Sequence, residues 1–143
     1  MMKKVKNILM FSLMTLLFTT LFATPVFAAN PSNWHVDLKA TQQPTAVGQS
    51  FSVTKGQSVK LGIDQYVKVN GLEDKTKSAN VIYQLYNVGT GIHVDFQVSA
   101  SVGGALGAPA TRTFTNMNGG TYVIRAVNLT SYVIASGGNV YVN

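Results

Sequence analysis

IHVDFQVS, residues 92–99, is the stretch that decides the fold class. Its apolar residues, Ile92, Val94, Phe96 and Val98, alternate strictly with polar ones. Alternation with a period of two is the pattern of a β-strand that has one face in a core and the other in water. We therefore predict a strand here, with these four apolar side chains buried.

The same alternation recurs along the chain, and no segment of helical length shows a 3.6-residue period. Turn signals separate the alternating segments, among them Asn70-Gly71, Gly89–Gly91 and Gly137-Gly138. So many short strands favour an all-β protein, an antiparallel β-sandwich, with a closed barrel as the alternative. The strands are expected at residues 34–38, 51–54, 59–63, 66–69, 81–88, 92–98, 111–115, 121–128, 132–135 and 139–142.

The N-terminus has the three parts of a cleavable signal peptide, which would form a signal helix before the sandwich. Three lysines precede an apolar run from Ile8 to Phe22, and Val26 and Ala28 stand three residues and one residue before the expected cut. The domains predicted are thus residues 1–28 as signal peptide, 29–49 as an N-terminal segment with the first strand, and 50–143 as the remainder of one β-sandwich domain. Residues 29–33 are expected to be frayed.

Charge and cysteine content narrow the function. The chain has 11 Lys and Arg against 5 Asp and Glu, and loss of the three signal-peptide lysines leaves a net charge of +3. The remaining lysines are dispersed, whereas a nucleic-acid binder shows a clustered basic stripe, so no nucleic-acid partner is expected. An exported chain without cysteine is typical of a bacterial secreted protein. No sortase-type motif is present, so we expect release into the extracellular space.

Two stretches resemble the immunoglobulin-like sandwich. GQSVKLGI, residues 56–63, is similar to its second strand, and NGGTYVIRAVN, residues 118–128, is similar to its sixth strand and preceding corner. The resemblance implies that Ile63 and Ile124 occupy the two cysteine positions and that Tyr122 forms a tyrosine corner. The second stretch also resembles bacterial secreted jelly-roll modules. The resemblance implies a sandwich, immunoglobulin-like or jelly-roll, and no activity.

One short motif occurs twice, as WHVDL at residues 34–38 and IHVDF at residues 92–96. An extended backbone places the His and Asp of each copy on one face. If the two strands were neighbours, His35, Asp37, His93 and Asp95 could bind zinc or a related cation. The other interpretation is that the His and Asp side chains of both motifs lie on the solvent-exposed faces of amphipathic strands. We favour the second, because residues 92–98 are expected to pair with residues 81–88 and so to separate the histidines.

The sequence offers little for catalysis. It has no G-x-S-x-G elbow, no HExxH and no phosphate-binding loop, and Glu73 is the one glutamate after residue 28. We therefore expect a non-enzymatic protein without cofactor. Tyr66, Tyr86 and Tyr141 alternate with apparent core residues, and exposed tyrosines can stack on sugar rings or enter a protein interface. The leading hypothesis is a secreted binding protein for cell-envelope or extracellular glycan, cell wall or a surface protein.

Two further hypotheses come from other classes. The uncharged segment Ser99–Ala110 is either a loop or strand bend where another backbone comes close, or a membrane-seeking or self-associating hairpin tip. A membrane-seeking tip would suit a small secreted membrane-active toxin or bacteriocin-like protein. This is the one hypothesis that includes membrane contact. A metal-dependent hydrolase built on the paired HVD motifs ranks third.

Overall fold

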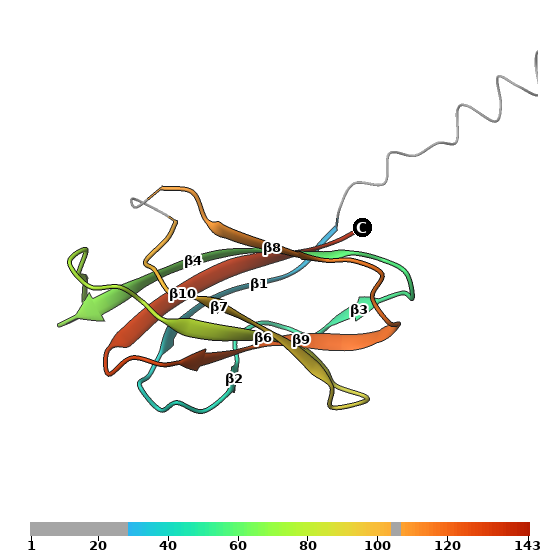
Figure 1. The fold of residues 1–143 in the computed structure, drawn as a ribbon, viewed down its shortest axis with the longest axis horizontal. Coiled ribbons are helices and arrows are strands. Elements are labelled where there is room, and N and C mark those ends of the chain that lie inside the picture. The colour runs from blue at the N-terminus through green and yellow to red at the C-terminus, as the bar shows by residue number, and fades with distance from the viewer. Residues whose placement is uncertain (1–28, 104–106) are drawn as a thin grey trace, which may run out of the picture.

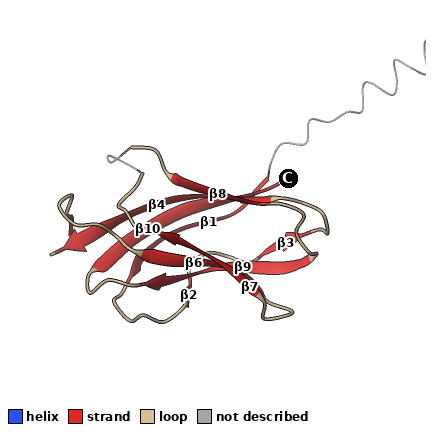
Figure 2. Ribbon diagram, viewed as in Figure 1, coloured by secondary structure: helices blue, strands red, loops and turns tan. Residues whose placement is uncertain are grey.

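The computed structural model describes residues 29–103 and 107–143. The expected signal peptide, residues 1–28, lies outside the described residues. All ten elements in the described part are β-strands, as Figure 2 shows. Across these residues there is no helix of the length and apolarity needed to cross a membrane. The all-β prediction is confirmed.

The strands form two antiparallel sheets that pack face to face (Figure 1). We call the first the β4 sheet; its strand order is β1-β10-β4-β5, and β8 also pairs with β4. We call the second the β6 sheet; its order is β2-β9-β6-β7, and β3 also pairs with β9. Two separate sheets that pack face to face make an antiparallel β-sandwich. The strands are β1 (Ala29–Leu38), β2 (Thr45–Ala46), β3 (Phe51–Val53), β4 (Val59–Val69), β5 (Leu72–Glu73), β6 (Val81–Asn87), β7 (His93–Val98), β8 (Ala110–Phe114), β9 (Gly120–Asn128) and β10 (Val133–Val142).

The strand order departs from the immunoglobulin-like expectation. β1 pairs with the last strand, β10, and not with the segments at residues 51–54 or 59–63. The tyrosine corner is nevertheless present, because the Tyr122 hydroxyl donates a hydrogen bond to the Asn118 carbonyl oxygen at 2.9 Å. The corner motif thus holds the turn before β9, while the chain order around it is that of a different sandwich.

The core contains most of the side chains expected there. Val59, Leu61, Ile63 and Ile124 have no exposed surface, and Tyr122 is 5% exposed. The prediction is wrong for two of the four apolar residues at positions 92–98, since Ile92 is 69% exposed and Val94 is 48% exposed, whereas Val98 is buried and Phe96 is partly buried against the core. These two side chains belong to the inward-facing row, but the β4 sheet does not cover them.

Three segments are more continuous than the sequence predicts. β4 joins the two strands expected at residues 59–63 and 66–69 into one. β10 passes through Gly137 and Gly138 without turning. The reason is Trp34, which pairs with Gly138 and whose indole lies over the place that a Gly138 side chain would fill. A glycine within a strand commonly marks such a close approach. At the N-terminus, β1 already begins at Ala29, and Ala29, Ser32 and Asn33 pair with β10 instead of fraying, with an irregularity in the register between Ala29 and Ser32.

Candidate functional site

The two HVD motifs do not meet. β1 lies in the β4 sheet and β7 in the β6 sheet, so His35 and Asp37 are on one outer face and His93 and Asp95 on the other. Asp37 binds the Lys68 ammonium at 2.7 Å, and His93 Nε2 lies 3.5 Å from Asp95 Oδ1. Within the described ranges, no group of three or more His, Cys, Asp or Glu could hold a metal ion. The four residues therefore form two separate polar surfaces.

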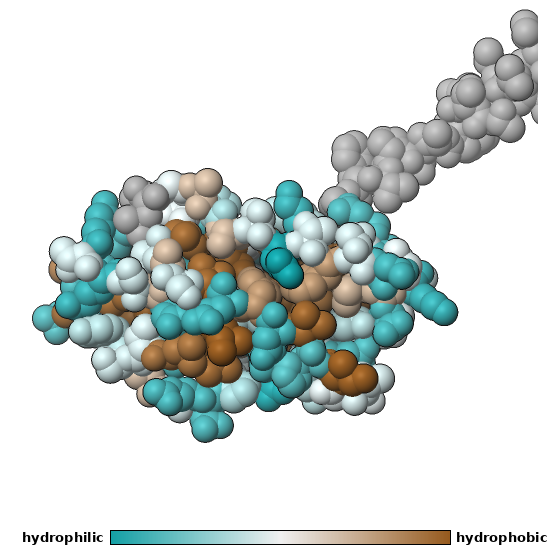
Figure 3. Space-filling view, viewed as in Figure 1, coloured by the Kyte–Doolittle hydropathy of each residue, from teal (hydrophilic) through white to brown (hydrophobic). Residues whose placement is uncertain are grey.

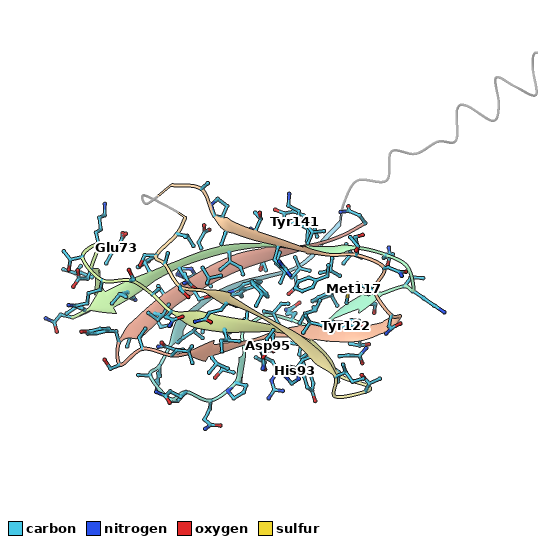
Figure 4. The ribbon with its side chains drawn as sticks, viewed as in Figure 1. Glu73, His93, Asp95, Met117, Tyr122 and Tyr141 are labelled. Atoms are coloured by element: carbon cyan, nitrogen blue, oxygen red, sulfur yellow. The ribbon has the colours of Figure 1, made fainter. Side chains whose placement is uncertain are left out.

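The three tyrosines expected to point outward are also apart. Tyr66 and Tyr141 lie on the outer face of the β4 sheet, but Tyr141 stands opposite Lys60, six residues from Tyr66 along β4. Six residues of strand span about 20 Å. Tyr86 lies on the other sheet, where the Arg125 guanidinium sits 4.5 Å from its ring centroid. Figure 4 shows Tyr141 on the opposite side of the molecule from His93 and Asp95. No single aromatic platform results.

A different feature emerges where the inner face of β7 loses its cover. Residues paired across a sheet point to the same side, so Val94 continues the row formed by Leu85 and Ile124. Ile124 is 0% exposed, Leu85 1% and Val94 48%. Along β7 itself, exposure rises from 9% at Val98 to 48% at Val94. The sandwich is thus closed at one end of β7 and open at the other.

An open groove of about 320 Å³ occupies this end of the sandwich. We call it the β7 groove. Its walls come from the hairpin between β6 and β7 and from the loop that precedes β9. In Figure 3, hydrophobic side chains reach the surface across the middle of the face that carries β6, β7 and β8. The lining consists of apolar or ring side chains at Leu85, Ile92, Val94, Met117 and Tyr122, with Asn87, Thr90, His93, Asn116, Asn118 and Gly119 around them.

The hairpin wall of the groove is held by Asn87. Its side-chain oxygen accepts hydrogen bonds from the backbone N–H groups of Gly89 at 3.0 Å and Thr90 at 3.1 Å. Its backbone oxygen accepts a third from Gly91 at 2.9 Å. Gly91 has a φ of +73°, a conformation that glycine adopts without strain. Hydrogen bonds within residues 87–91 therefore fix the turn.

The opposite wall is held by Met117. Its backbone N–H donates to the Gln57 oxygen at 2.9 Å, and its own oxygen accepts from the Gly56 N–H at 2.8 Å. The bond from Tyr122 to the Asn118 oxygen closes the same loop. Figure 4 places Met117 and Tyr122 side by side at this end of the molecule. Both walls are thus preformed, which lowers the entropy cost of binding a ligand.

The sequence contained the signals for this groove, but they have other ordinary meanings. The run Asn118–Gly120 predicts only a turn, although Asn118 and Gly119 line the groove, and no sequence signal pointed to Asn116 and Met117 beside them. Ile92 and Val94 predicted a core strand. Nothing in a local pattern shows that a correctly oriented apolar row lacks a covering sheet, because the cover comes from distant residues.

The segment that begins at Ser99 is tied to β4 over its described part. The backbones of Gln65 and Val102 exchange hydrogen bonds of 2.9 and 2.8 Å, and the Gln65 side-chain amide donates to the Val98 and Ala100 oxygens. Residues 104–106 lie outside the described residues. For Ser99–Gly103 this geometry favours the interpretation as a bend close to another backbone.

No family model and no curated protein matches this chain. Similar solved structures include a protein from Sulfurospirillum deleyianum, with 12% identity over 78% of this chain and 97% of that one and a TM-score of 0.39. A chain of infectious bursal disease virus, Gt strain, has 12% identity over 80% of this chain and 30% of its own, with a TM-score of 0.42. A carbohydrate-binding module of Cellvibrio mixtus lichenase 5A, in complex with cellotriose, has 8% identity over 81% and 89%, with a TM-score of 0.37. Likenesses this distant carry no argument about function.

Proposed function

We propose that this protein is a secreted, non-enzymatic β-sandwich that binds an extracellular glycan in the β7 groove. The observation that carries the proposal is the groove itself, which has a volume of about 320 Å³ and an apolar floor surrounded by amides. Ligand sites are usually concave and mostly apolar, with a few polar groups that fix orientation, and have volumes from about 300 Å³ upward. The β7 groove fits that description.

The chemistry of the lining favours an uncharged, hydroxyl-bearing ligand. Asn116 and Asn118 bring exposed amides to the groove, and an amide side chain both donates and accepts hydrogen bonds. A sugar has hydroxyls that suit such groups and C–H faces that suit Ile92 and Val94. These groups hold and orient a ligand, and we propose no reaction.

Export is the second part of the proposal. It rests on the basic, apolar and small-residue parts of residues 1–28. Expression of the full chain in a bacterial host, followed by N-terminal sequencing of protein from the medium, tests it. Mature protein beginning at Ala29 supports export, whereas protein that keeps its first 28 residues inside the cell contradicts it.

A titration of the isotope-labelled chain with neutral oligosaccharides and soluble cell-wall polysaccharide tests the glycan. We expect chemical-shift changes in Ile92, Val94, Met117 and Asn118. The variant Asn118→Trp should block the groove, because this exposed side chain lines it while only the backbone oxygen serves Tyr122. Tyr141→Ala, on the far side of the molecule, is the matched control.

Two outcomes would contradict the proposal. If Tyr141→Ala loses binding and Asn118→Trp keeps it, a tyrosine on the outer face of the β4 sheet is the site. If no glycan binds and the groove resonances shift instead with a purified surface protein, the ligand is a protein.

A further inference from the structure

β7 is an edge strand, paired on one side of its backbone and open on the other. In the part of the chain that the structure describes, its one partner strand is β6. The Ile92 carbonyl oxygen accepts a hydrogen bond from the Asn87 N–H at 2.8 Å, so the Ile92 carbonyl points toward β6. Backbone groups alternate in direction along a strand. Those of His93, Asp95 and Gln97 therefore point away from the sheet, toward solvent.

The same edge also presents unburied apolar side chains, which distinguishes it from β1. Both strands carry the HVD motif and both end a sheet. In β1 the flanking residues Trp34 and Leu38 are 6% and 4% exposed. In β7, Val94 is 48% exposed, and Ile92 just before it is 69% exposed. An edge with free backbone groups beside bare apolar side chains is a template for adding a strand.

We propose that a second copy of this chain adds that strand, with the two β7 strands antiparallel around a two-fold axis at Val94. In this register Val94 faces Val94 of the other copy, and Ile92 faces Phe96. The outward residues pair His93 with Asp95 in both directions. The sequence IHVDF is thus self-complementary, with apolar opposite apolar and imidazole opposite carboxylate.

The backbone geometry agrees with this register. Because the free groups belong to His93 and Asp95, each His93–Asp95 pair can exchange two N–H···O bonds, while Val94 forms a non-hydrogen-bonded pair on the axis. Moving the axis to Asp95 would set two carboxylates opposite each other, and moving it to His93 would set two imidazoles opposite each other. Like charges directly opposite destabilise a strand pair, which disfavours the axis at Asp95. An axis at His93 loses both pairs of imidazole and carboxylate, so the axis at Val94 is favoured over both.

This dimer would join the two β6 sheets into one continuous sheet and bring the two β7 grooves next to each other. It goes beyond the proposed glycan binding and does not depend on it, because the contact is formed by β7 alone. Failure of glycan binding would leave the dimer intact, and absence of a dimer would leave each groove intact.

Cysteine substitution tests the register directly. The chain has no cysteine, so a single introduced cysteine can form only an intermolecular disulfide. A non-hydrogen-bonded antiparallel pair has Cα atoms about 4.5 Å apart, inside the disulfide range of about 4.4–6.8 Å. Val94→Cys in the chain from Ala29 to Asn143, which contains both sheets, should become a covalent dimer under mild oxidation.

Ile92→Cys is the matched control for that experiment. It is more exposed than Val94, yet in the proposed dimer its own copy lies four residues along the strand, about 13 Å away. Random collision would therefore oxidise Ile92→Cys at least as fast as Val94→Cys. Equal or faster oxidation of Ile92→Cys overturns the proposal.

Sedimentation velocity over a concentration series gives a second test without cysteine. The unmodified chain should self-associate. His93→Asp should weaken association by about tenfold, because the two-fold axis places two like-charged pairs at once, and the double variant His93→Asp with Asp95→His should restore it. A monomer at every concentration, or a double variant that stays as weak as the single one, overturns the proposal.

Discussion

The hydroxyl of Tyr83 in β6 lies 2.7 Å from Oγ of Ser136 in β10, and this contact joins the two sheets through the middle of the core. Tyr83 is fully buried and donates its one hydroxyl proton to Oε1 of Gln65 at 2.9 Å. Ser136 must therefore donate to Tyr83. Its Oγ in turn accepts the Trp34 indole N–H at 3.1 Å. Each donor in this series of hydrogen bonds, from Trp34 through Ser136 and Tyr83 to Gln65, therefore has an acceptor.

The first prediction follows from that chain of bonds. Tyr83→Phe removes the donor to Gln65 and the acceptor for Ser136, and buried polar groups left unpaired cost about 1–3 kcal/mol. We expect the free energy of unfolding to fall by about that amount in a denaturant titration. Tyr141→Phe, on the outer face of the β4 sheet, should leave it unchanged. An equal effect of both substitutions would contradict a role for the buried chain.

The second prediction concerns alkaline pH. Burial raises the pKa of the Tyr83 hydroxyl above its ordinary value. A raised folded-state pKa gives stability that is complete below the unfolded-state pKa of about 10 and is lost as pH rises above it. Thermal unfolding should therefore occur at lower temperature as the pH rises above about 10. In Tyr83→Phe this dependence should be weaker, and an identical pH profile in both proteins would refute the assignment.

The third prediction separates facing inward from being buried. Ile124→Ala should lower the free energy of unfolding by about 2–5 kcal/mol, because Ile124 is 0% exposed and its loss leaves a cavity. Ile92→Ala should change it by less than about 0.5 kcal/mol, because Ile92 is 69% exposed. Urea unfolding at low protein concentration measures both. A large cost at Ile92 would mean that the β4 sheet covers it.

The fourth prediction uses the two adjacent glycines of β10. A Cβ at Gly138 would overlap the Trp34 indole and lie 2.7 Å from the Gly62 oxygen, whereas one at Gly137 has its nearest neighbours at 3.5 Å. Gly138→Ala should cost about 1–3 kcal/mol through overpacking. Gly137→Ala should cost less. The difference in melting temperature between the two variants is the measurement, and equal temperatures would contradict the close approach of Trp34.

The fifth prediction is a gain in stability. Gln84 is 8% exposed, and its Oε1 is the one buried side-chain polar atom in the described ranges without a hydrogen-bond partner. Gln84→Met keeps the length of the side chain and removes the unpaired oxygen, so we expect about 1 kcal/mol more stability. Gln97→Met is the control, because Gln97 is exposed and its amide donates to Asn80 at 2.7 Å. A loss of stability in Gln84→Met would show that Oε1 has a partner in solution.

The candidate site includes some features that a local sequence pattern predicts and others that it cannot predict. The outward tyrosines and the HVD motifs were read from alternation, which correctly gives the side of the strand on which a residue lies. It could not bring Tyr66 and Tyr141 together with Tyr86, because they lie on different sheets. The prediction of a turn at Asn118–Gly120 agrees with the loop before β9, but the place of this loop beside the β6–β7 hairpin depends on pairing between segments distant in sequence.

The sequence by itself determined the positions of the longer strands, the face on which each side chain lies and the tyrosine corner at Tyr122, because all three follow from spacing within a few residues. It did not predict the two-residue strands β2 and β5 or the continuity of β4 and β10. Tertiary structure alone decided that Trp34 keeps β10 straight at Gly138 and that β1 lies beside the last strand. It also decided that Val94 faces inward and is still exposed. Burial requires a second surface in contact with the first, and the β4 sheet does not extend over Val94.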